Sequence, residues 1–136
     1  IGQIVVAALP LVFGVTFDYV HAHSVFTHAP RSMIRRFLAN LRSALAPGGI
    51  FVGTWVVGEE DFAGTEWAYP VTVTYRVASF RAMVEEAGFT LHVLRWPHPE
   101  QTYFAICEPG LDLRSRLEMH QSAFGIDLLQ KDQYQP

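Results

Sequence analysis

Cysteine is scarce in this sequence, and positive charge is not in excess. Cys107 is the single cysteine among 136 residues, so the chain can form neither an intramolecular disulfide nor a cysteine-based metal cluster. This cysteine usage suits a reducing compartment, and we expect a cytoplasmic protein. Ten lysines and arginines against thirteen aspartates and glutamates give a net charge of −3. We therefore expect neither nucleic acid nor a membrane as a partner, because no electrostatic attraction favours them.

The sequence also lacks a hydrophobic run long enough to cross a membrane. Residues 4–15 are strongly apolar, but a spanning helix takes roughly 20 residues, and Pro10 and Gly14 interrupt this stretch. We interpret residues 3–9 as a short buried strand that Pro10 ends, because proline cannot donate a ladder hydrogen bond. The chain begins with Ile1 rather than Met, which fits a processed or partial chain.

Half of the residues are hydrophobic, which supplies the core of one domain. The clearest element is a helix from Arg31 to Leu45, whose apolar residues recur every three or four positions. Pro30 suits its first turn, and Pro47-Gly48-Gly49 is predicted to stop it. A second helix is predicted from an N-cap at Ser79 to Ala87, followed by Gly88. Strands are predicted at 17–22, 50–57, 89–96 and 102–107, with a short extended piece at 71–77.

This order of elements predicts an α/β fold. The helical connections favour parallel pairing, whereas the turn Pro97-His98-Pro99 is too short for a crossover, so the last two strands should be antiparallel. We assign residues 1–110 to this domain. Residues 111–136 form a C-terminal tail, in which Leu113 and Leu117 could line a short helix.

Several stretches carry a resemblance to a known family. They are 17–28 (FDYVHAHSVFTH), 37–42 (FLANLR), 45–54 (LAPGGIFVGT), and Phe80 with 84–89 (VEEAGF). In this order they resemble the C-terminal half of a class I S-adenosylmethionine-dependent methyltransferase, over about residues 3–108. The resemblance implies a Rossmann-like three-layer sheet that is incomplete at the N-terminus. It also implies S-adenosylmethionine as cofactor and methyl transfer to a small-molecule acceptor.

The chain departs from the family pattern in its first half. The family's glycine-rich loop and its ribose-binding acidic residue have no counterpart here, and Gly48-Gly49 follows a helix rather than a first strand. We therefore expect this chain alone to bind S-adenosylmethionine weakly or not at all. Two alternatives stay open: a non-catalytic binding or scaffold module that kept the fold and lost the cofactor site, and an unrelated small α/β interaction protein.

The resemblance also suggests site residues. The methionine side of the cofactor would be lined by Ala8, Leu9, His21, Ala22, His23 and Ser24. His23 and His28 are the catalytic candidates, since histidine titrates near neutrality, although they could be ordinary polar loop residues. We expect no metal, because the spacing of His21, His23 and His28 does not match a helical metal-binding pair.

The acceptor is expected to contact Phe26, Trp55, Glu59 and Trp67. The loop 58–70 combines aromatic and acidic side chains, which suits a small, partly apolar or cationic acceptor. The alternative is a loop that packs its own aromatic side chains. We also expect a homodimer, because the strand 17–22 would lack its usual first-strand neighbour, and an exposed apolar strand edge favours pairing with another chain.

Overall fold

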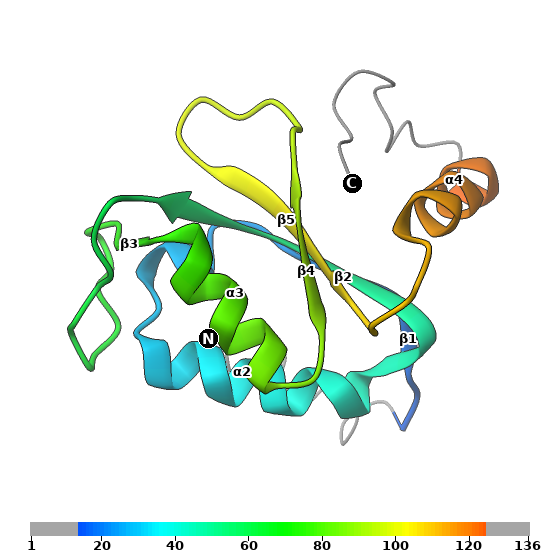
Figure 1. The fold of residues 1–136 in the computed structure, drawn as a ribbon, viewed down its shortest axis with the longest axis horizontal. Helices are drawn as coiled ribbons and strands as arrows, with labels where there is room; N and C mark the ends of the chain where they lie inside the picture. The colour runs from blue at the N-terminus through cyan, green and yellow to red at the C-terminus, as the bar shows by residue number, and fades with distance from the viewer. Residues whose placement is uncertain (1–13, 125–136) are drawn as a thin grey trace.

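The computed structural model describes residues 14–124 of the 136-residue chain. The strand predicted at 3–9, with the site candidates Ala8 and Leu9, lies outside these residues. No helix of the described part is long and apolar enough to cross a membrane. The elements, in order, are β1 (Phe17–Ala22), η1 (Phe26–His28), α2 (Arg31–Ala44), β2 (Leu45–Val57), β3 (Thr74–Tyr75), α3 (Val77–Glu86), β4 (Thr90–Leu94), β5 (Thr102–Cys107) and α4 (Leu113–Phe124) (Figure 1).

The sheet has the strand order β1-β2-β5-β4, and β3 pairs with the end of β2. β1 and β3 run parallel to β2, while β5 is antiparallel to both of its neighbours, β2 and β4. Within this sheet β5 is therefore reversed, and the remaining strands share one direction. The prediction of an α/β fold, mostly parallel with an antiparallel C-terminal strand pair, is confirmed.

Helices cover both faces of the sheet, which gives three layers. α2 and α3 lie side by side on one face (Figure 1), where Ile34, Leu38 and Phe80 pack against Phe51 and other buried sheet residues. α4 covers the other face. Its residues Leu113 and Leu117 form a second buried cluster with Ile50, Val52, Leu94 and Ala105.

The predicted helix stop at Pro47-Gly48-Gly49 is wrong. α2 ends at Ala44, Leu45 already has extended backbone angles (φ −83°, ψ 135°), and β2 begins there. The Pro-Gly-Gly segment lies instead in an irregularity of the pairing between β1 and β2, since Phe17 pairs with Leu45 and Tyr19 with Ile50. Glycine is needed at Gly49, because an added Cβ would lie 2.8 Å from the Ala46 oxygen and 2.9 Å from the Phe17 oxygen.

The start of α3 also differs from the prediction. Arg76 is the N-cap and the helix begins at Val77, so Ser79 lies inside the first turn. Its hydroxyl donates to the Asp61 carboxylate rather than to the helix backbone. Of the predicted extended piece at 71–77, Thr74–Tyr75 is strand. Gly88 follows the helix with a φ of +80°, as the sequence predicted.

Candidate functional site

The carboxyl ends of β1 and β2 lie at the same edge of the sheet, because the two strands are parallel. In α/β folds this edge is where ligands bind. β1 ends at Ala22 and leads into His23 and Ser24, while β2 ends at Val57 and leads into the loop 58–73. Two side-chain clusters follow from these connections, one around Ser24 and one around His28.

Ser24 has a backbone conformation that is rare for a residue with a side chain, with a φ of +56°. Its N–H donates to the buried Thr54 hydroxyl (2.9 Å), and its carbonyl accepts from the Thr27 hydroxyl (3.0 Å). Its own hydroxyl lies 2.8 Å from Gln101 Nε2, which donates to it. This backbone conformation costs on the order of 1–2 kcal/mol for a non-glycine residue. The hydrogen bonds with Thr54, Thr27 and Gln101 offset this cost and keep Ser24 in the strained conformation.

A group of aromatic rings surrounds His23, the neighbour of Ser24. The ring centroid of His23 lies 6.3 Å from that of His21, 5.3 Å from that of His98 and 6.0 Å from that of Tyr103. His98 comes from the turn between β4 and β5. Burial lowers the pKa of His21, and the nearby charge of His23 adds to that effect. The sequence predicted His98 only as part of a turn, since nothing in the local sequence indicates that this turn lies beside β1.

His28 anchors the second cluster, on the loop side of the same edge. Its ring lies 5.5 Å from that of Trp67 and 5.3 Å from that of Tyr69. Its Nδ1 is 2.9 Å from the Val71 carbonyl oxygen. Because a carbonyl can only accept, Nδ1 carries the proton, and Nε2 holds the lone pair of the neutral ring. The structure thus gives His28 a defined tautomer with a basic nitrogen at Nε2.

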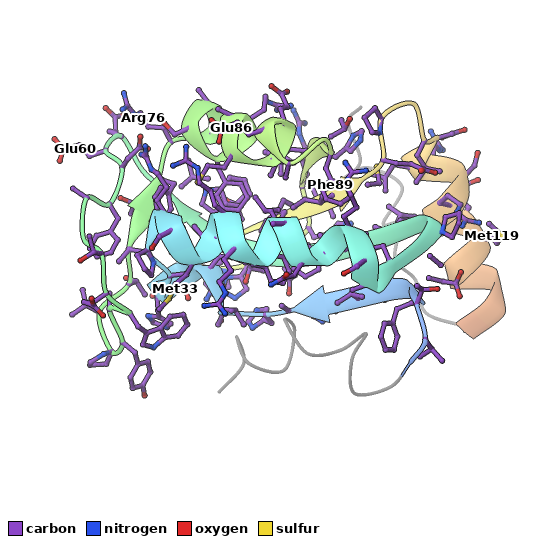
Figure 2. All side chains as sticks on the ribbon, turned by 90° about the horizontal axis from the view of Figure 1, so that it is seen from below. Met33, Glu60, Arg76, Glu86, Phe89 and Met119 are labelled. Carbon is purple, nitrogen blue, oxygen red and sulfur yellow. The ribbon has the colours of Figure 1, made fainter. Side chains whose placement is uncertain are left out.

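The loop 58–73 is held near its start, at Asp61, and in its second half, at Ala68. The Ala68 N–H donates to the His28 carbonyl (2.9 Å). At the other end Asp61 accepts hydrogen bonds from the Ser79 hydroxyl (2.6 Å) and the Arg76 N–H (2.9 Å), and it forms an ion pair with Arg31. Figure 2 shows Arg76 where α3 begins and Glu60 on the loop, and the Glu60 carbonyl accepts from the Thr74 hydroxyl (2.9 Å). Burial opposes ionisation of Asp61, but the hydrogen bonds to Asp61 and the Arg76 charge outweigh it and lower the pKa of Asp61 to about 2.

The candidates for acceptor binding divide between the core and the loop. Phe26 is 2% exposed and Trp55 is 0% exposed. Trp55 stacks on Phe80 with ring centroids 4.8 Å apart, and its Nε1 donates to the Tyr75 carbonyl (3.3 Å). The structure therefore places Phe26 and Trp55 in the core, and their side chains do not reach an accessible surface. The other two candidates, Glu59 and Trp67, are exposed on the loop.

Among residues 14–119, whose side chains the structure describes, no three histidine, cysteine, aspartate or glutamate side chains are placed to hold a metal ion. Cys107 is buried, as the sequence suggested, and burial followed by the Glu108 charge raises the pKa of its thiol to about 11. A buried thiol that stays protonated fits a structural role in the core. Histidine, hydroxyl and amide groups therefore supply the polar chemistry of the two clusters.

No protein-family model and no curated protein matches the sequence. Solved structures do match. A complex of DhpI with SAH is 22% identical, with a TM-score of 0.53, and the match covers 69% of this chain and 48% of that one. Magnesium protoporphyrin IX methyltransferase (ChlM) from Synechocystis PCC 6803, with bound SAM, is 12% identical, with a TM-score of 0.52, and the match covers 76% and 42%.

Human N-acetylserotonin methyltransferase in complex with SAM is 12% identical, with a TM-score of 0.53, and the match covers 67% of this chain and 29% of that one. The chain spans about half or less of the length of these three structures. At such identities the likeness concerns the fold. The described chain has the fold of part of a class I methyltransferase.

Proposed function

We propose that this chain is the part of an S-adenosylmethionine-dependent methyltransferase that faces the methionine end of the cofactor and a small-molecule acceptor. The observation that carries the proposal is Ser24, held with a φ of +56° at the carboxyl end of β1 by hydrogen bonds from three segments. Strained residues of this kind persist where the surroundings over-determine them, and they cluster at ligand sites. The SAM- and SAH-containing structural neighbours support the assignment through their shared fold.

The residues fit the cofactor in part. His21, Ala22, His23 and Ser24 stand at the ligand edge of the sheet, and we propose that they face the methionine part together with Ala8 and Leu9. No glycine-rich loop or ribose-binding acid in this sequence could hold the rest of the cofactor. We therefore propose that full binding and activity need groups that this sequence does not contain.

When bound, S-adenosylmethionine supplies a methyl group on a sulfonium, whose transfer needs mainly alignment of donor and acceptor. We assign His28 Nε2 to take the proton that the acceptor atom loses, because the Val71 carbonyl holds the ring proton on Nδ1. His23, at the end of β1, is the second catalytic candidate. Glu59 and Trp67 on the loop would contact the acceptor.

A second function remains in competition: a non-catalytic module that kept the fold. The absence of the cofactor loop and the ribose acid from the sequence favours it. On either function we propose a cytoplasmic location, on the evidence of the cysteine usage.

Isothermal titration calorimetry with S-adenosylmethionine tests how complete the cofactor site is. We expect weak binding or no measurable heat from the 136-residue chain. Sub-micromolar affinity would show that the chain makes the cofactor contacts that we consider missing. Adenosine is the matched control ligand, because it lacks the methionine part that the β1 end is proposed to contact.

A further inference from the structure

Ser24 is held by two kinds of hydrogen bond, and only one kind depends on its side chain. The bond from its N–H to the Thr54 hydroxyl (2.9 Å) and the bond from the Thr27 hydroxyl to its carbonyl (3.0 Å) use backbone groups. A glycine at this position would keep both bonds and would adopt the positive φ without steric cost. The backbone contacts therefore do not account for a residue with a side chain at this strained position.

The Ser24 side chain connects the end of β1 to the turn between β4 and β5. Its hydroxyl oxygen lies 2.8 Å from Gln101 Nε2 and 3.2 Å from Gln101 Oε1. The hydroxyl has one proton, which either Gln101 Oε1 or His23 Nδ1 (3.1 Å) can accept. With either acceptor the Gln101 amide still donates to the hydroxyl oxygen, so the link between Ser24 and Gln101 does not depend on the tautomer of His23.

Gln101 is itself held in place on both sides along the chain. Before it, the N–H groups of Glu100 and Gln101 donate to His98 Nδ1, over 3.1 and 2.8 Å. After it, Thr102 begins β5, which pairs with both β2 and β4. The half-buried Gln101 side chain therefore reaches Ser24 from a fixed segment of backbone.

We propose that Gln101 is a positioning residue for the ligand edge of the sheet. Its amide group holds Ser24 in the conformation with a φ of +56°, and this conformation sets the direction in which the chain leaves β1. Strain that distant contacts maintain in this way is typical of ligand sites. That the ligand is a methyl donor rests on the proposed function, whereas the positioning of Ser24 by Gln101 does not.

Hydrogen exchange of the Ser24 amide, followed by NMR on the full chain, tests this positioning. The Ser24 N–H exchanges with solvent when its bond to Thr54 opens. Gln101→Met keeps the length of the side chain and removes its hydrogen-bonding groups. We expect the Ser24 amide to exchange about fivefold faster in this variant, the change that corresponds to the loss of one neutral hydrogen bond. The Ala68 amide, which is bonded to His28 in the loop 58–73, is the reference and should keep its wild-type rate.

Two further variants separate positioning from a general loss of stability. Glu100→Met changes the exposed neighbouring residue and should leave the exchange of the Ser24 amide unchanged. Ser24→Gly removes both the hydroxyl and the strain, so adding Gln101→Met to it should not accelerate exchange at position 24. The positioning role is overturned by an unchanged rate at Ser24 in Gln101→Met, by equal acceleration in Glu100→Met, or by equal acceleration at Ala68.

A separate arm with S-adenosylhomocysteine tests the ligand. A ligand that binds the ordered end of β1 stabilises that conformation, so it should slow the exchange of the Ser24 amide in the wild-type chain. If Gln101→Met accelerates this exchange and S-adenosylhomocysteine does not slow it, the positioning role of Gln101 stands and the result counts against the proposed function alone.

Discussion

Asp61 should stabilise the protein through its charge, and Asp61→Asn should show this. The substitution keeps the shape of the side chain and removes its charge, while the Ser79 hydroxyl, the Arg76 N–H and the Arg31 guanidinium remain around it. These groups lower the pKa of Asp61 from 3.8 to about 2 although burial opposes them. Since one pKa unit is about 1.4 kcal/mol, the ionised carboxylate contributes about 2 kcal/mol to the free energy of unfolding. Although its side chain is only 12% exposed, Asp61 lies close to the protein surface and its arginine partners are exposed, so solvent screening makes this figure an upper limit.

The pH dependence follows from the direction of this shift. The pKa is lower in the folded than in the unfolded chain, so the stabilisation is complete above the ordinary value of 3.8 and is lost as the pH falls through about 2. The wild-type chain should therefore lose more stability than Asp61→Asn over this acidic range. At neutral pH the variant should be less stable by up to about 2 kcal/mol.

Urea denaturation followed by tryptophan fluorescence is a suitable assay, because Trp55 is fully buried and reports on the core. Glu60→Gln is the matched control. Glu60 is an exposed carboxylate in the same loop, and its loss should change stability by less than about 0.5 kcal/mol. If Asp61→Asn and Glu60→Gln have equal effects, or if the two curves of stability against pH run parallel in acid, the reasoning about Asp61 is wrong.

The remaining predictions concern α2, His28 and self-association. Leu41→Ala should lower the free energy of unfolding by about 2–5 kcal/mol in a denaturant titration, because Leu41 is fully buried. Arg35→Ala should lower it by less than about 0.5 kcal/mol, because the ion pair of Arg35 with Glu86 is exposed. Equal losses would mean that the buried face of α2 is misassigned. Histidine nitrogen spectra at high pH should show the Nδ1–H tautomer for His28, and the Nε2–H form would contradict the bond to Val71. Light scattering should give the mass of a dimer, as the sequence analysis predicts, and a monomer mass would refute self-association.

Periodic patterns allowed much of the fold to be predicted. β5 was predicted with the observed bounds, and α2 with its observed start, because apolar spacing reports directly on which face is buried. The end of α2 was predicted at Leu45, one residue beyond its observed end. The stop signal was misassigned, because Pro47, Gly48 and Gly49 lie in β2, at an irregularity of its pairing with β1. A local composition signal cannot distinguish these two uses.

The candidate site was less predictable. Ser24 and Gln101 form a hydrogen bond although they are 77 positions apart in the sequence. They meet because β5 lies between β2 and β4 in the sheet, which brings the turn that contains His98 close to the end of β1. Trp55 was assigned to the ligand side from its place near the end of a strand. The position of a residue along a strand does not determine which face of the sheet its side chain points to. Side chains alternate between the two faces, so Trp55 lies on the same face as Phe51, which α3 covers.

The central claim is that His21–Ser24, at the carboxyl end of β1, face the methyl donor. Backbone amide NMR spectra recorded while S-adenosylhomocysteine is added at increasing concentration test this most directly, because weak binding still produces local shifts. We predict shifts that are largest at His23 and Ser24, with Ser115 in α4, on the opposite face of the sheet from α2 and α3, unaffected. Shifts confined to other parts of the chain, with the amides of His23 and Ser24 unaffected, would contradict the claim and favour the non-catalytic module.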